Sequence, residues 1–184
     1  MSRVEDSLVL VLGIDTGLVR TAIAIVKDQK CLWRGTIHVE GEDTGPRFAV
    51  LREALDEVFN RVDNPACVAI EEPPLVIFHG HAAGSVLKLY GSFAVAYAEA
   101  VRHWPDTHII GVTPDMWKGT LDKESTETTL RAKYKVECAN DHEWDALGLA
   151  DWHGRRRKRF AERRKGVLDV SNRRGIILGS LGAP

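Results

Sequence analysis

Four side chains able to bind metal ions stand at points where the chain passes from one expected element to the next. They are Asp15, Glu71, His142 and Asp145. The first two each close an apolar, strand-like run, and the last two lie three residues apart at the start of a helix-like stretch. Carboxylates at the ends of buried strands are typical of divalent-metal sites, and paired ions hydrolyse phosphodiesters. The pattern therefore predicts a metal-dependent nuclease.

The kinds of ligand favour magnesium over zinc. Mg²⁺ takes oxygen ligands and keeps several waters, whereas Zn²⁺ favours His and Cys in tetrahedral sites. We expect two Mg²⁺ ions about 4 Å apart, with Mn²⁺ able to substitute. Asp141 is an alternative to His142 as the fourth ligand. Glu72 is an alternative to Glu71, although strand alternation should turn it to the other face of the sheet.

Apolar patterning predicts an α/β fold. Buried or alternating runs predict strands at residues 8–15, 20–27, 31–39, 66–71 and 108–112. Apolar spacings of three and four, with start and stop signals, predict helices at residues 46–62, 84–103 and 125–135. Two further helices are expected to begin at residues 113–114 and at residue 140 or 141. Short turns join the first three strands, which predicts an antiparallel meander. The later alternation of strands and helices predicts a mixed sheet with parallel crossovers.

The predicted order of elements brings the four positions together. The first strand is apolar throughout and should be central, so Asp15 should lie at the rim where open α/β folds place their sites. The strand ending at Glu71 is apolar in the same way and can lie beside it. Asn140 and Glu143 resemble a capping box, and the helix they begin presents His142 and Asp145 on one face.

The chain has 184 residues, a length that suits one folded domain. Its 44% hydrophobic and 28% charged residues are typical of a globular protein. No apolar run approaches the roughly 20 residues needed to span a bilayer, and the N-terminus does not resemble a signal peptide. The three cysteines, Cys31, Cys67 and Cys138, form no C-x-x-C pair. Together these features predict a cytoplasmic protein with reduced thiols and no membrane segment.

The net charge of −1 conceals a basic block. Residues 154–174 hold ten Lys/Arg and two Asp/Glu, a charge of +8, against −9 for the rest of the chain. We therefore divide the chain into a nuclease domain at 1–153 and a basic extension and tail at 154–184. The block indicates a polyanion partner, and its alternative is a solvated helix end. Five consecutive basic residues would surround a helix and bind nucleic-acid backbone without sequence preference: Arg155, Arg156, Arg157, Lys158 and Arg159.

Three segments carry a family resemblance: residues 12–17, 69–71 and 142–150. They resemble the three acidic motifs of RuvC-type Holliday junction resolvases, which belong to the ribonuclease H-like superfamily. The resemblance covers about residues 8–153 and implies a mixed five-stranded sheet flanked by helices. It also implies a homodimer that cuts four-way DNA junctions symmetrically with Mg²⁺. Residue by residue, it makes Asp15, Glu71 and Asp145 metal-binding catalytic carboxylates, with His142 where many relatives have Asp and some have His.

Further roles and departures follow from the resemblance. Lys118 and Lys123 lie where the family uses lysines to hold phosphate. Thr16 replaces the usual proline, and Pro74 stands where bacterial resolvases often place an aromatic wedge, which leaves Phe78 as a candidate wedge. These departures indicate a divergent member of the family, with a phage as one candidate origin.

Alternative functions stay open on the sequence alone. One is a structure-selective nuclease acting on other branched DNA or on RNA, and another is a non-catalytic nucleic-acid-binding module. For the homodimer, the helix at residues 84–103 is a candidate interface, and core packing is the alternative for the same side chains. Those side chains are Leu87, Tyr90, Phe93 and Tyr97.

Overall fold

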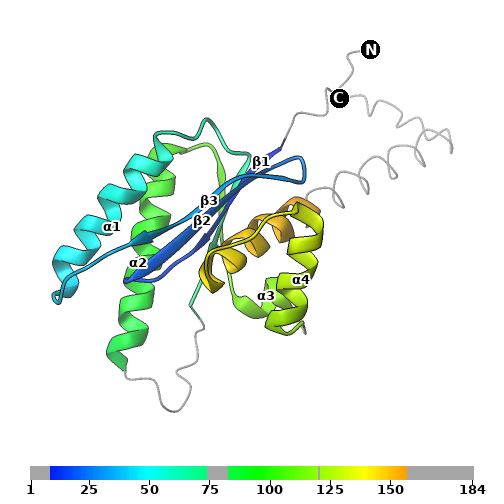
Figure 1. Ribbon diagram of the computed structural model, residues 1–184. Helices are drawn as coiled ribbons and strands as arrows, with labels where there is room; N and C mark the ends of the chain where they lie inside the picture. The colour runs from blue at the N-terminus through cyan, green and yellow to red at the C-terminus, as the bar shows by residue number, and fades with distance from the viewer. Residues whose placement is uncertain (1–8, 74–82, 120, 157–184) are drawn as a thin grey trace, which may run out of the picture. The chain divides into compact units, whose positions relative to one another are not determined.

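A mixed five-stranded sheet organises the described part of the chain, residues 9–73, 83–119 and 121–156 of a computed structural model. The strand order is β3-β2-β1-β4-β5, so the first strand is central as predicted (Figure 1). The strands are β1 (Leu10–Asp15), β2 (Arg20–Lys27), β3 (Lys30–His38), β4 (Cys67–Glu71) and β5 (His108–Val112). The α/β class and the five-stranded mixed sheet expected from the sequence are both confirmed.

One half of the sheet is the predicted antiparallel meander. β1 pairs with β2, and β2 pairs with β3, all antiparallel. Asp28 and Gln29 join β2 to β3 and have positive φ angles of 48° and 64°. Positive φ at both central residues is characteristic of a type I′ turn, whose twist matches that of the flanking strands. The tight hairpin holds β3 at the edge of the sheet.

The other half of the sheet is parallel. β4 lies parallel to β1 with Ile14 opposite Ile70, and β5 lies parallel to β4 with Val112 opposite Glu71. Parallel neighbours need crossover connections, which α1 (Thr44–Phe59) and α2 (Ala83–His103) supply. As a result, the carboxyl ends of β1, β4 and β5 share one edge of the sheet.

One face of the sheet is covered by α1 and α2, which pack over a large apolar core (Figure 1). This core includes Leu12, Ile14, Ile23, Leu51, Leu55, Phe59, Val68 and Ile70. Apolar positions at spacings of three and four turn one stripe of each helix toward the sheet. Both helices were predicted, and their observed bounds differ by at most three residues from the prediction.

The opposite face is covered by α3 (Pro114–Lys118), α4 (Lys123–Tyr134) and a helix that spans residues 141–156. Gly13 of β1 allows the last helix to approach unusually closely. A Cβ atom at Gly13 would lie 2.0 Å from the carbonyl oxygen of Ala146 and 2.7 Å from the amide nitrogen of Ala150. Only glycine leaves room for this contact, which sets how near the start of the helix comes to the end of β1.

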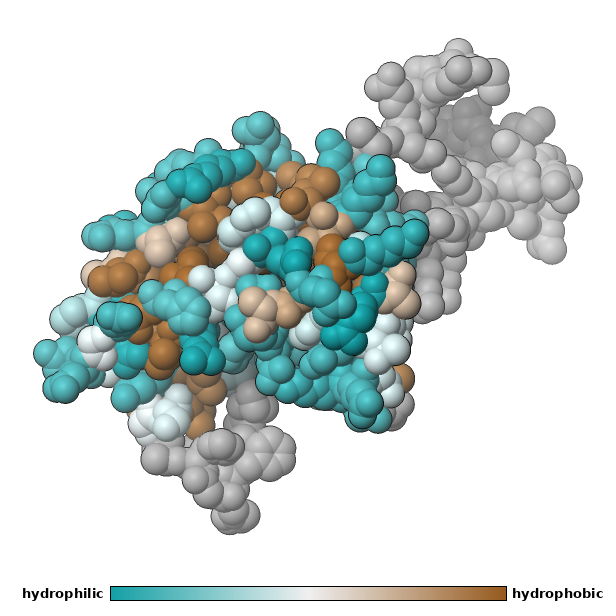
Figure 2. Space-filling model, in the orientation of Figure 1, coloured by the Kyte–Doolittle hydropathy of each residue, from teal (hydrophilic) through white to brown (hydrophobic). Residues whose placement is uncertain are grey.

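The chain divides into two compact units, residues 1–154 and 155–184, and all five strands and α1–α4 belong to the first. In Figure 2 the side with α3 and α4 is mainly hydrophilic, whereas hydrophobic residues are exposed on the side with α1 and β3. Among the described residues, no helix is long and apolar enough to cross a membrane.

Candidate active site

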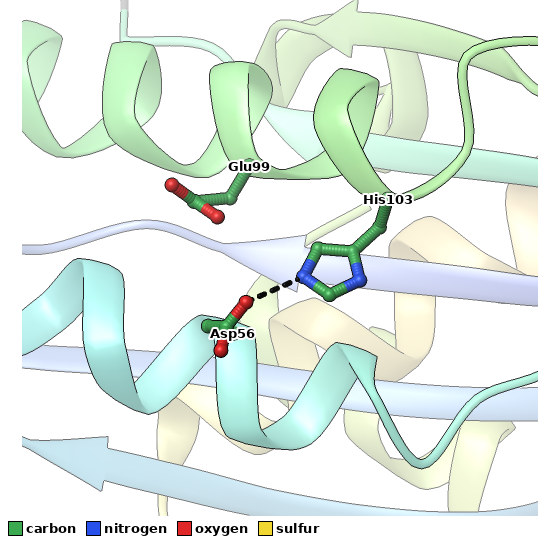
Figure 3. Close-up of side chains that lie close together, drawn as sticks. All are labelled: Asp56, Glu99 and His103. Carbon is green, nitrogen blue, oxygen red and sulfur yellow. Dashed lines mark hydrogen bonds and ion pairs between the residues drawn. The ribbon is translucent and has the colours of Figure 1, made fainter.

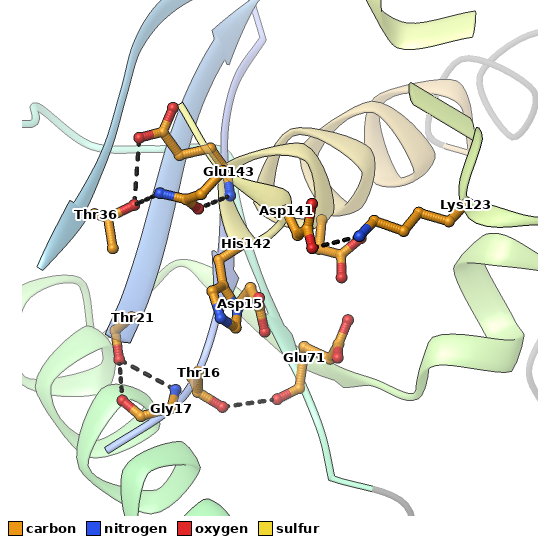
Figure 4. Close-up of polar contacts among 12 residues, drawn as sticks. Asp15, Thr16, Gly17, Thr21, Thr36, Glu71, Lys123, Asp141, His142 and Glu143 are labelled. Atoms are coloured by element: carbon orange, nitrogen blue, oxygen red, sulfur yellow. Dashed lines mark hydrogen bonds and ion pairs between the residues drawn. The ribbon is translucent and has the colours of Figure 1, made fainter. Parts of the chain in front are cut away.

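The candidate site lies where β1 and β4 end beside the start of the last helix. Asp15 is the final residue of β1 and Glu71 the final residue of β4. The parallel register of these strands places the two residues side by side at the edge of the sheet. Figure 4 shows the Asp15 side chain between those of His142 and Glu71. Three elements distant in sequence thus contribute to one polar group.

The start of the helix at residues 141–156 is fixed by a cap and by a contact with β3. The side-chain oxygen of Asn140 accepts a hydrogen bond from the Glu143 amide at 3.1 Å, and the Glu143 carboxylate accepts one from the Ala139 amide at 3.0 Å. Asn140 thus caps the helix as predicted, whereas the Glu143 carboxylate bonds the Ala139 amide and not the Asn140 amide that a capping box would use. The Asn140 amide also donates to the Thr36 hydroxyl at 3.0 Å. The cap therefore holds the first turn of the helix against the sheet.

His142 contacts Asp15 directly. Its Nδ1 lies 2.7 Å from Oδ2 of Asp15, with the His142 side chain 42% exposed and that of Asp15 8% exposed. The hydrogen bond to Asp15 raises the pKa of His142 above its ordinary value. The ring is therefore oriented by a carboxylate and still reaches solvent.

Glu71 is a carboxyl group surrounded by like charges. Burial, followed by the charges of Asp15 and Asp145, raises the pKa of Glu71 to about 7. A hydrogen bond from the Trp117 indole N–H to Oε2, 3.0 Å long, partly opposes this rise. Burial and the neighbouring carboxylates thus both disfavour the ionised form of Glu71.

Asp145 shares this environment and has one cationic neighbour. Burial raises its pKa, and the charge of Asp15 adds to the rise. Lys118 Nζ lies 2.9 Å from Oδ2 of Asp145 and lowers the pKa in part. The lysine also lies 4.7 Å from the centre of the Trp117 ring. One ammonium group thus faces a group of three carboxylates.

Both alternative ligands point elsewhere. Asp141 forms an ion pair with Lys123, and this contact lowers the pKa of Asp141. A Cβ atom added to Gly111 would lie 2.9 Å from Oε2 of Glu72 and would also contact Phe93 of α2. Glu72 therefore faces the side of the sheet covered by α1 and α2, as strand alternation predicts.

The expected nucleic-acid contacts are only partly within the described residues. Lys118 and Lys123 lie beside the candidate site, through their ion pairs with Asp145 and Asp141. Arg155 and Arg156 are exposed at the end of the last helix. The remaining candidates, Phe78, Arg157, Lys158 and Arg159, lie outside the described residues.

A second acidic group lies between α1 and α2 (Figure 3). The group consists of Asp56, Glu99 and His103. Within the described residues, the possible ligand atoms of these three side chains all lie within 4.8 Å of one another. The ligand atoms of the candidate site, Asp15, Glu71, His142 and Asp145, do not meet this criterion. Arginines occupy the second group, however: Arg102 pairs with both of its carboxylates, and Arg52 pairs with Glu99 at 3.8 Å. It is therefore an ion-pair network that joins two helices.

Trp117 was not among the residues chosen from the sequence, although it touches Glu71 directly. Tryptophan belongs to no acidic motif. The available signal was its position, in a short helix that begins with Thr113-Pro114 immediately after β5. Since the end of β5 lies opposite Glu71, this helix had to start beside the candidate site.

Comparison with solved structures places the chain in the ribonuclease H-like fold, in its RuvC-type form. RuvC from T. thermophilus in complex with a Holliday junction substrate matches with a TM-score of 0.67 and 21% identity, covering 79% of this chain and 92% of RuvC. A further T. thermophilus RuvC structure matches with a TM-score of 0.64 and 20% identity, over 79% and 93%. The yeast mitochondrial Holliday junction resolvase Ydc2 matches with a TM-score of 0.53 and 15% identity, over 80% of each chain.

Sequence comparison gives no corresponding match. No protein-family model matches the chain, and no curated protein matches it significantly. The resemblance to RuvC expected from the acidic motifs is thus confirmed by the fold.

Proposed function

We propose that this protein is a metal-dependent endonuclease that resolves four-way DNA junctions by symmetric phosphodiester hydrolysis. One observation carries the proposal. Three carboxylates from separate elements meet at the strand ends of a RuvC-type fold, where burial and neighbouring carboxylates raise the pKa values of Glu71 and Asp145.

The residues present suit divalent cations. Asp15, Glu71 and Asp145 offer carboxylate oxygens, and the exposed ring of His142 offers a nitrogen. Mg²⁺ prefers oxygen ligands, and Mn²⁺ accepts imidazole more readily. When bound, two such ions supply an activated water and stabilisation of the leaving oxygen.

The neighbouring residues have separate tasks in this proposal. Asp15 orients the His142 ring through their 2.7 Å contact. Lys118 balances part of the charge of Asp145 and can contact a substrate phosphate at the same edge. Lys123, whose side chain is 59% exposed, extends this positive charge outward. Arg155, Arg156 and the basic residues that follow hold the DNA backbone, so the affinity should fall steeply with salt.

We further propose a homodimer formed through α2. Leu87, Ala94 and Val101 follow one another at intervals of seven residues on α2, and all three are exposed. Leu87 is 71% exposed and Val101 is 42% exposed. A seven-residue apolar repeat is the pattern by which two helices pair. Tyr97, 37% exposed, adjoins this seam. A pair related by a two-fold axis would present two sites to a pseudo-symmetric junction.

Two of the four side chains expected at that interface serve the protomer itself. The Tyr90 hydroxyl donates to the Pro73 carbonyl at 3.0 Å, and Phe93 packs against the core beneath α1 and α2. Glutamate at both Leu87 and Val101 should therefore convert a dimer into a folded monomer in sedimentation. A native chain that sediments as a monomer at micromolar concentration, with junction cleavage intact, would contradict the dimer.

The decisive experiment compares four-way, three-way, duplex and RNA–DNA hybrid substrates in Mg²⁺ and in EDTA. We expect paired, symmetric cuts in the four-way junction only with Mg²⁺. Preferential cleavage of three-way or RNA-containing substrates would replace the junction with another branched substrate. Binding without metal-dependent cleavage of any substrate would instead identify a non-catalytic nucleic-acid-binding module.

A further inference from the structure

Trp117 contacts the Glu71 carboxylate of the candidate site. Its side chain belongs to α3, is 6% exposed and donates from the indole N–H to Oε2 of Glu71 at 3.0 Å. An indole N–H can only donate a hydrogen bond. The indole therefore holds a carboxylate oxygen in place and cannot itself bind a cation through its nitrogen.

Packing fixes the Trp117 ring firmly. A Cβ atom on Gly148 would lie 2.2 Å from the ring, so the indole rests directly on the backbone of the last helix. Ala69, Val112 and Leu149 complete a small apolar cluster around it. The ring thus touches β4 through Glu71 and the helix that carries Asp145 through Gly148. A donor held in this way has little freedom to follow a moving carboxylate.

Glu71 needs such a donor because of its surroundings. The negative charges of Asp15 and Asp145 lie close enough to disfavour its ionised form. Without a fixed partner, the carboxylate would turn away from these neighbours and from the position of a shared cation. Trp117 engages Oε2, and among the described residues no other side chain hydrogen-bonds this carboxylate, so Oε1 can act as a ligand.

We propose that Trp117 is a positioning residue, which orients the Glu71 carboxylate for a divalent cation. This inference rests on the proposed function, in which Glu71 is a metal ligand. Groups that orient metal ligands commonly change metal affinity about 10–100-fold when removed. Trp117 therefore acts through Glu71 and takes no part in the chemistry itself.

The test measures Mn²⁺ binding by calorimetry in the absence of DNA. Trp117→Phe removes the indole N–H donor together with part of the ring that rests on Gly148, and we expect Mn²⁺ binding about 10-fold weaker. Trp104→Phe is the matched control, because Trp104 is 5% exposed and donates its indole N–H to the Val62 carbonyl, on the opposite face of the sheet. The control should leave the affinity unchanged. Thermal unfolding compares the general cost of losing each indole.

A double-mutant cycle separates positioning from a general loss of structure. Since Trp117 acts through Glu71, Trp117→Phe should weaken Mn²⁺ binding much less in a Glu71→Gln background. An affinity for Trp117→Phe within twofold of the native value would overturn the inference. So would an equal loss in both backgrounds. If Glu71→Gln itself leaves Mn²⁺ binding unchanged, the proposed metal site fails, and the inference fails with it. If Glu71→Gln weakens binding and Trp117→Phe does not, only the inference fails.

A measurement on the native protein covers the case in which Trp117→Phe does not fold. The ¹H–¹⁵N signal of the Trp117 indole should shift as Mg²⁺ is added, because the Glu71 carboxylate it contacts changes its charge environment. The Trp104 indole signal should stay in place. A Trp117 signal that does not respond at saturating Mg²⁺ would overturn the inference.

Discussion

The two acidic groups of this protein have similar residue types and opposite electrostatics. The group between α1 and α2 has two carboxylates, one histidine and two arginines, and Arg102 lowers the pKa of Asp56. The group at the strand ends has three carboxylates, one histidine and one lysine, and burial and like charge raise the pKa of Glu71 to about 7. The first is more compact and contains two arginines, whereas the second has one lysine beside three carboxylates.

Under the proposed function, charge is a better guide to the metal site in this fold than compactness is. Side chains on two packed helices find partners on neighbouring turns, as Arg102 finds Glu99 three residues away. Asp15 and Glu71 end parallel strands, so their partners come from other elements, as His142 and Trp117 do. In the proposed function, a bound cation supplies the positive charge that complements these carboxylates.

The largest expected effect comes from Asp145→Asn. Removing a ligand carboxylate should reduce junction cleavage at least about 1,000-fold, the equivalent of about 4 kcal/mol in the barrier. Binding to the junction should persist, since it depends on basic residues. Single-turnover cleavage and gel-shift assays measure the two properties. Asp56→Asn in the other group is the matched control and should cut at the native rate. Equal losses in both variants would remove the distinction between the groups.

Glu71→Gln should change the pH dependence of stability of the metal-free protein. The pKa of Glu71 rises from 4.5 to about 7 on folding, so the folded state holds its proton more tightly. The native protein then loses stability as the pH rises from about 4.5 through 7, and the glutamine variant does not. At pH 8 we expect Glu71→Gln to be more stable by on the order of 2 kcal/mol. Chemical unfolding across this range measures the difference, and parallel pH curves would contradict it.

His142→Asp should alter metal preference at modest cost in rate. The variant adds an oxygen ligand where the imidazole now stands, which favours Mg²⁺ over Mn²⁺ relative to the native protein. The ratio of cleavage rates in the two metals is the measurement. His103→Asp supplies the matching change in the other group and should leave this ratio unchanged. A constant ratio in His142→Asp would show that His142 is not a ligand.

The smallest expected effect comes from Arg102→Ala. The Arg102 side chain is 52% exposed, so solvent screens its ion pairs with Asp56 and Glu99. We expect a slight fall in the thermal unfolding midpoint and no change in Mn²⁺ affinity or cleavage rate. A gain of tight Mn²⁺ binding in this variant would show that arginine alone keeps the helix group from being a metal site.

The elements of the fold were predictable because their signals are local. The apolar run of β1 indicated burial on both faces and hence a central strand. Asn140 and Glu143 indicated the start of the last helix, and Asn140 caps it in the structure. Periodicity and capping depend on residues a few positions apart, so they can be read without knowing how the elements pack.

Contacts between elements were not predictable in the same way. The sequence left His142 and Asp141 as alternatives, and the tertiary structure places His142 against Asp15 and pairs Asp141 with Lys123. The ion-pair network between α1 and α2 had no motif at all. Such contacts depend on how closely two elements approach, and a change of one or two ångströms exchanges one partner for another.

The sequence alone determined that carboxylates would end the central strands and that a helix would begin with His142 and Asp145. Only the tertiary structure decided which side chains face one another. Gly13 admits the last helix against β1, and Gly148 admits the Trp117 ring that reaches Glu71. The reason is physical: strand and helix signals are set by neighbouring residues, whereas the charge balance of a site depends on all the elements that meet there.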